Sequence, residues 1–150
     1  MIVISHRGNI HGPNPAHENT MSQILECINK NIQVEIDVWR INQSLMLGHD
    51  EPQYQLPLAF LLDYKDMLWI HCKNLDAFEY LTDFAQFNVF WHQNDDCTLT
   101  TKGSIWTYPN KPVTAKSVIV CQDVEQTKKY FSHQIRGICT DFVSSVINVL

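Results

Sequence analysis

Two acidic residues, Glu35 and Asp37, stand in a run that is otherwise rich in β-branched residues. Because successive side chains of a strand point to opposite faces, both carboxylates share one face, while Val34, Ile36 and Val38 take the other. Two carboxylates this close resist burial unless a cation or a strong hydrogen-bond donor lies between them. The pattern therefore indicates a cation site on a strand. The alternative is an exposed edge strand with both acids in solvent.

A second apolar run, residues 45–47, leads into Gly48, His49 and Asp50. Histidine is the side chain whose ordinary pKa best suits proton transfer near neutral pH. We therefore expect two strand ends to bring acids and an imidazole together. A histidine in a surface loop is the alternative.

Strand and helix patterns alternate along the rest of the chain. The β-branched run from Ile2 to Ile4 is typical of a strand buried on both faces, and Thr20 or Asn19 can cap the helix that follows. Asn74 can cap a later helix in the same way. The patterns predict strands over residues 2–4, 34–38, 45–47, 67–73, 87–92, 104–108, 117–121 and 136–141, helices over 21–30, 58–62, 75–84 and 123–131, a polar loop over 95–102 and an apolar tail over 143–150.

These elements predict an α/β fold, a short (β/α)8 TIM-type barrel. Several strands carry polar residues at their C-terminal ends, which is where such a barrel builds its site. At 150 residues the chain is well below the ~250 residues usual for this fold, so several crossover helices must be missing. A doubly wound sheet is the competing fold, but its first strand would more often be followed by a glycine-rich phosphate loop than by His6-Arg7-Gly8.

Length and composition limit the class of protein. The chain, residues 1–150, is expected to form one domain, and its net charge of −5 argues against nucleic acid as a partner. Its five cysteines are widely spaced without a CxxC pair, which favours free thiols in a reducing compartment. Neither a signal peptide nor a run long enough for a membrane span is visible, so we expect a cytoplasmic protein.

Four motifs occur in order on successive units of the predicted barrel: His6-Arg7-Gly8, Glu18-Asn19-Thr20, Glu35-x-Asp37 and Gly48-His49-Asp50. With these motifs the chain resembles the glycerophosphodiester phosphodiesterase family. That family belongs to the barrel superfamily that also contains the phosphatidylinositol-specific phospholipases C. Fainter similarities at residues 70–73, 105–107 and 137–141 extend the resemblance over nearly the whole chain.

The resemblance implies that His6 and His49 form the catalytic acid–base pair. It also implies that Glu35 and Asp37 bind a divalent cation. The chemistry agrees, because a cation that bridges phosphodiester oxygens lowers the barrier, while one imidazole takes a proton and another gives one to the leaving group. Carboxylate ligands suit Mg²⁺ or Ca²⁺.

The resemblance further places Arg7 and Lys73 near the substrate phosphate. Two departures from the family pattern stand out. His71 occupies the place of the third metal-binding glutamate, which would move the preference towards Mn²⁺ or Zn²⁺. The Arg-Thr pair that usually follows the second catalytic histidine is absent from residues 51–54.

The function predicted is metal-dependent hydrolysis of a small glycerol- or sugar-linked phosphodiester. Two alternatives stay open: a degenerate barrel that binds a phosphorylated ligand without turnover, and a phospholipase C-like lyase. His92 ends a strand at the functional face without a family counterpart, so its role is undecided. Because missing helices would leave apolar barrel flank exposed, a homodimer is also expected.

Overall fold

The computed structural model describes residues 1–149, so the last residue of the tail predicted over 143–150 lies outside the described residues. The strands are β1 (Ile2–His6), β2 (Gln33–Ile41), β3 (Ser44–Leu47), β4 (Tyr54–Gln55), β5 (Leu68–Cys72), β6 (Val89–Phe90), β7 (Cys97–Leu99), β8 (Ile105–Thr107), β9 (Ser117–Cys121) and β10 (Gly137–Thr140). The helices are α1 (Met21–Asn29), α2 (Leu58–Asp63), α3 (Leu75–Thr82), α4 (Val124–Lys128) and α5 (Val143–Ile147).

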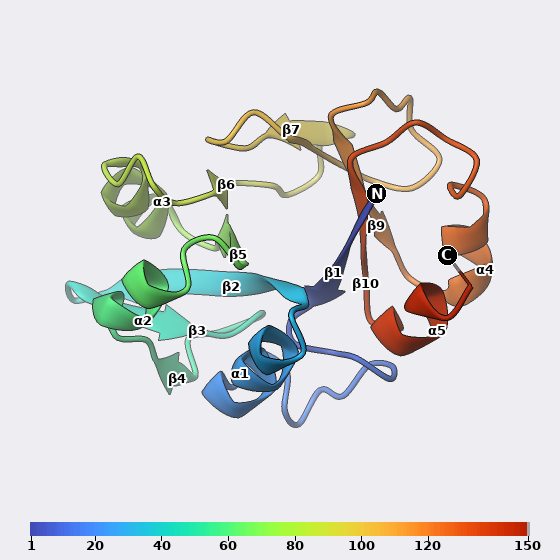
Figure 1. Cartoon of the computed structure of the whole chain (residues 1–150). Helices are drawn as coiled ribbons and strands as arrows, with labels where there is room; N and C mark the ends of the chain where they lie inside the picture. The colour runs from blue at the N-terminus through green and yellow to red at the C-terminus, as the bar shows by residue number, and fades with distance from the viewer. Residues whose placement is uncertain (150) are drawn as a thin grey trace.

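The strands form one curled sheet. Its parallel part has the order β6-β5-β2-β1-β10-β9-β8, in which the last strands of the chain return beside the first. The strands β3 and β4 extend β2 as antiparallel hairpins. In Figure 1 the parallel strands curve around a common centre and the helices lie on the outside. The prediction of an α/β fold is confirmed.

The side chains that start the helices match the sequence patterns. The Thr20 hydroxyl accepts a hydrogen bond from the Gln23 amide, and the Asn74 carbonyl accepts one from the Ala77 amide, so both predicted caps are confirmed. In the described residues, no helix stands between β6 and β8 or between β8 and β9, in agreement with the expected loss of crossover helices. The helix α4 ends at Lys128, three residues before the predicted end.

The seam between β6 and β8 is where the sheet departs from a closed barrel. Within residues 1–149 no ladder joins these two strands, and β7 pairs antiparallel with β8 instead. The prediction of a loop over residues 95–102 was therefore wrong: three residues pair there, and their polar neighbours concealed them. Stacked rings of Phe90 and Trp106, with centroids 4.5 Å apart, pack across the seam.

Thr101 supplies the missing hydrogen bonds along the edge of β6. Its amide donates to the Val89 carbonyl at 2.9 Å, while its hydroxyl accepts from the Val89 amide at 2.9 Å and donates to the Phe87 carbonyl at 2.8 Å. One threonine thus takes the place of a neighbouring strand.

Replacing Thr101 by Val should lower the free energy of unfolding by about 1–3 kcal/mol, because the buried Val89 amide would lose its acceptor. Urea denaturation measures this. Thr98→Val on β7 is the matched control and should change stability by less than about 0.5 kcal/mol. Equal effects of the two variants would show that Thr101 does not hold the seam.

Alternation along the strands separates two packed regions. The interior of the curled sheet is filled by one buried cluster, whose members are Ile4, Trp69, Phe90, Trp106, Val118 and Cys139. Between the sheet and helices α1, α2 and α3, the opposite faces of β2 and β5 contribute Val34, Ile36, Val38, Ile70 and Cys72. The two acids of β2 therefore face inwards, as predicted. Across residues 1–149, no helix is both long and apolar enough to cross a membrane.

Candidate active site

A cavity of about 230 Å³ opens at the C-terminal ends of the parallel strands. It collects most of the predicted site residues, which line it from different strands and loops: His6, Arg7, Glu35, His49 and His71. The remaining two, Asp37 and Lys73, lie beside these residues, and their charged groups are 3.6 Å apart. The sequence therefore identified groups that the fold brings to one place.

The acid pair of β2 is almost fully buried. Glu35 and Asp37 are each 1% exposed, and both approach Nδ1 of His71, at 3.6 and 3.0 Å. The interpretation of an edge strand with solvated acids is excluded by this burial.

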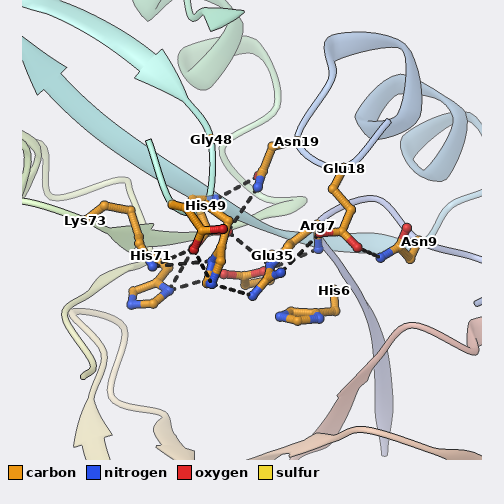
Figure 2. Close-up of polar contacts among 12 residues, drawn as sticks. His6, Arg7, Asn9, Glu18, Asn19, Glu35, Gly48, His49, His71 and Lys73 are labelled. Atoms are coloured by element: carbon orange, nitrogen blue, oxygen red, sulfur yellow. Dashed lines mark hydrogen bonds and ion pairs between the residues drawn. The ribbon is translucent and has the colours of Figure 1, made fainter. Parts of the chain in front are cut away.

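Asp37 is the centre of the cluster. Its Oδ2 accepts hydrogen bonds from the Asn19 amide at 3.0 Å and from Nδ1 of His49 at 3.1 Å. Figure 2 shows Arg7, His49, His71 and Lys73 converging on this part of β2. Three further distances complete the set: Arg7 Nε to Oδ2 is 3.2 Å, His71 Nδ1 to Oδ1 is 3.0 Å, and Lys73 Nζ to Oδ1 is 3.6 Å.

Burial and these neighbours act on the pKa of Asp37 in opposite directions. Burial alone would raise it, but the hydrogen bonds from His49 and His71 and the charge of Lys73 hold it well below the ordinary value. Asp37 is therefore ionised at neutral pH and ready to hold positive charge.

His71 responds to the same carboxylates. Burial would lower its pKa, but the hydrogen bonds to Asp37 and Glu35 raise it from 6.5 to about 9. Near neutral pH its imidazole is therefore a cation between two acids.

The donor set around His71 also fits a divalent cation. One ligand atom from each of Glu35, Asp37 and His71 lies within 4.8 Å of the others, and the buried Oδ1 of Asp37 faces positive groups, with Nδ1 of His71 at 3.0 Å and Nζ of Lys73 at 3.6 Å. Nε2 of His71 donates to the His92 carbonyl at 2.9 Å. Metal-binding histidines usually anchor their second nitrogen in this way, which turns the other nitrogen towards the ion.

The contacts of His49 favour one tautomer. Its Nδ1 faces the Asp37 carboxylate at 3.1 Å and the Lys73 ammonium at 3.4 Å, and its Nε2 faces the Arg7 guanidinium at 3.1 Å. Because the carboxylate is the closer neighbour of Nδ1, we assign the proton to Nδ1, and Nε2 keeps the lone pair that a general base needs.

A glycine turn sets the position of His49. Gly48 has φ +149°, and a Cβ at that position would collide with the Glu51 carbonyl oxygen. The indole of Trp39 donates to the Gly48 carbonyl at 2.6 Å and fixes the turn against β2.

His6 is held by a residue that the sequence analysis missed. Its Nδ1 lies 3.0 Å from Oδ1 of Asp141, which also accepts a hydrogen bond from the Asn9 amide at 2.7 Å. Burial lowers the pKa of His6, but the hydrogen bond to Asp141 and the charge of Glu35 outweigh it and the pKa is raised. Asp141 follows the last parallel strand, so the rule of polar residues at strand ends could have identified it.

Arg7 is bound on three sides by the protein itself. Beyond its contact with Asp37, Nη1 donates to Glu18 at 3.1 Å and Nη2 to His49 at 3.1 Å. Asn9 donates to the other oxygen of Glu18 at 2.9 Å. Glu18 and Asn9 are thus positioning residues for Arg7.

His92, whose role the sequence left undecided, lines the cavity. Its Nε2 donates to the Asp95 carbonyl at 2.7 Å and its ring packs on Tyr108, with centroids 4.3 Å apart. Burial lowers the pKa of His92. These contacts make it part of the cavity wall.

The chain is similar to a known protein at the level of structure. No protein-family model matches the chain, and no curated protein matches its sequence. A crystal structure from Galdieria sulphuraria, described as that of "a putative glycerophosphodiester phosphodiesterase", matches with a TM-score of 0.60. The match covers 99% of this chain and 96% of that chain at 13% sequence identity. The likeness is one of fold, and at that level it confirms the predicted resemblance.

The raised pKa of His71 predicts a pH dependence of stability. A group whose pKa is higher in the folded state stabilises the fold fully below its unfolded value of 6.5 and loses this contribution as pH rises through about 9. In the absence of divalent cations, the free energy of unfolding should therefore fall by up to about 3 kcal/mol over this range. Urea titrations at several pH values measure the slope. His71→Gln should remove most of it, and an unchanged slope in that variant would contradict the assignment.

Proposed function

We propose that this chain hydrolyses a small phosphodiester, linked to glycerol or a sugar, with His6 and His49 as acid and base. The observation that carries the proposal is the pair of imidazoles in one cavity, each bound through Nδ1 to a buried or half-buried aspartate, beside an acidic cluster. The fold shared with a protein described as a glycerophosphodiester phosphodiesterase supports the same reaction class.

The two histidines differ in a way that suggests their roles. His6 has a raised pKa and is suited to give a proton to the leaving alkoxide. His49 keeps a lone pair on Nε2 and is suited to take a proton from the attacking water. Asp141 and Asp37 hold the rings in these tautomers and stabilise the imidazolium that each forms when protonated.

Glu35, Asp37 and His71 would hold a divalent cation, Mg²⁺ or Ca²⁺, or Mn²⁺ or Zn²⁺ because of the imidazole. Such a cation supplies Lewis-acid stabilisation of the phosphoryl oxygens. Lys73, with Nζ 3.6 Å from Asp37, would add a positive charge beside the phosphate. Arg7 would reach it after leaving His49.

A second function is favoured by the engagement of Arg7. Because Nη2 of Arg7 covers Nε2 of His49, the base is blocked until the guanidinium moves. A protein that binds a phosphorylated ligand without turnover would keep this contact.

Phosphorus NMR separates the two functions. The purified chain is incubated with a panel of glycerol- and sugar-linked phosphodiesters, with each divalent cation and with chelator. A new monoester resonance that grows with time supports hydrolysis, and a cyclic phosphate resonance supports the lyase. Shifted or broadened substrate signals without product support ligand binding alone. His6→Ala, purified in parallel, controls for contaminating phosphodiesterases.

Restoring an acid at position 71 tests the cation site. His71→Glu should tighten Mg²⁺ binding by about tenfold, because a third carboxylate replaces a group that must lose a proton before it can bind. Isothermal titration calorimetry measures this without an assay. His11→Glu, at an exposed histidine, is the control. A destabilised His71→Glu protein with unaltered Mg²⁺ affinity would place His71 in a structural role.

A further inference from the structure

A second cavity, of about 280 Å³, opens at the N-terminal ends of the same parallel strands. Gln33 and Trp69, near the starts of β2 and β5, contribute to its lining. The packed interior of the sheet, which includes Trp69 near the N-terminal end of β5, separates this cavity from the candidate active site. These two cavities therefore open at opposite ends of the parallel strands, and we call the first the upper cavity and the second the lower mouth.

Basic side chains gather at this lower mouth. Lys65, Lys102 and Arg136 reach it from the turns that precede β5, β8 and β10, with Asp66 as the one acid among the lining residues. In the part of the chain that the structure describes, the only ion pair formed by these three cations is that of Lys65 with Asp66, at 3.8 Å. In a protein of net charge −5, this is a local excess of positive charge.

Two amides add hydrogen-bonding capacity to the mouth. Asn88 lines the cavity, is 9% exposed, and its amide oxygen has no hydrogen-bond partner within residues 1–149. Buried amides are nearly always paired with protein or ordered water, so this oxygen is available to accept a hydrogen bond from a molecule in the cavity. The side-chain carbonyl of Gln33 accepts a hydrogen bond from the Trp69 indole at 2.7 Å, which identifies the other end of this side chain as the NH₂ donor.

We propose that this lower mouth is a binding site for a phosphate group, either free or in a phosphate monoester. Three cations from three different turns can surround a tetrahedral dianion, whereas a planar carboxylate carries one charge and two oxygens. The hydroxyl of free hydrogen phosphate can donate to the amide oxygen of Asn88, whereas a monoester dianion has no proton on its phosphate group and would need a hydroxyl of its alcohol part for this bond. In both cases the side-chain NH₂ group of Gln33 can donate to an unprotonated phosphate oxygen. The site is independent of the catalytic proposal, because it shares no residue with the upper cavity.

The tryptophan indoles allow each mouth to be observed separately. Trp69 lies at the lower mouth, and its indole N–H bonds Gln33. The indole of Trp39 bonds the Gly48 carbonyl next to His49. In ¹⁵N–¹H spectra, assigned with Trp69→Phe and Trp39→Phe, titration with inorganic phosphate at constant ionic strength should shift the Trp69 signal saturably.

The double variant Lys102→Gln/Arg136→Gln should raise the dissociation constant for phosphate, measured from the Trp69 indole signal, by at least about tenfold. Lys116→Gln, at an exposed lysine outside the cavity, should leave it unchanged. A parallel titration with glycerol 3-phosphate distinguishes the two possible ligands. Tighter binding of inorganic phosphate identifies the ligand as free phosphate, and tighter binding of glycerol 3-phosphate identifies it as a monoester. A Trp69 signal that does not move, that moves equally with chloride, or that moves equally in the double variant would overturn the proposal.

Discussion

Asp37→Asn is expected to reduce phosphodiester hydrolysis by about 10²- to 10³-fold and the free energy of unfolding by about 3 kcal/mol. Both losses have one cause. The carboxylate contacts several cationic or proton-donating side chains. Because the site is buried, water cannot compensate these positive charges once the negative charge is lost. The neutral amide keeps the size of the side chain and its bond to Asn19, so the loss reports on charge.

Asp50→Asn is the matched control for this prediction. Its side chain is 94% exposed and its oxygen lies 3.6 Å from Nε2 of His49, so it approaches the same imidazole from solvent. Loss of the Asp50 charge should change the hydrolysis rate and the free energy of unfolding little, because exposed ion pairs contribute little to stability. Chemical denaturation and phosphorus NMR on both variants give the comparison. Full activity of Asp37→Asn would remove Asp37 from the mechanism, and a divalent cation that raises the melting temperature of wild type and variant equally would remove it from the cation site.

The shared face of the two acids of β2 could be predicted because it depends on alternation alone. Once residues 34–38 form a strand, Glu35 and Asp37 must share a face, and the same rule placed His71, near the end of β5, and Lys73, just after it, on one side. Parallel pairing then sets His71 opposite Asp37 in register. Spacing within each segment was therefore sufficient to predict which of these side chains share a face.

The partner of His6 depends on the closure of the whole sheet. Asp141 is distant in sequence and reaches His6 because β10 pairs parallel with β1, from Ile2 opposite Gly137 to Ser5 opposite Thr140. No spacing within a single segment encodes that contact. The seam is similar: the predicted closed barrel would pair the strands over residues 87–92 and 104–108, and the bonds of Thr101 to β6 take the place of that pairing.

His6→Ala should lower turnover of an alkyl phosphodiester by about 10²- to 10⁴-fold, the range typical of a lost general acid or base. The loss should nearly disappear with a nitrophenyl phosphodiester, because nitrophenolate leaves without protonation. His49→Ala should lose activity on both substrates, since its proposed role concerns the attacking group. Rescue of His49→Ala in place of His6→Ala would exchange the two roles, and full activity of both variants on the alkyl substrate would end the acid–base proposal.

Asp141→Asn refines this test, because it leaves the imidazole of His6 in place. Without the carboxylate, the pKa of His6 should fall, since the hydrogen bond from Nδ1 to Asp141 is the main influence that raises it. A general acid acts only while protonated, so activity on the alkyl substrate should decline at a lower pH in this variant than in the wild type. The position of this alkaline limb in pH–rate profiles is the measurement. A limb that stays in place while turnover falls at every pH would show that Asp141 orients the ring without tuning its proton.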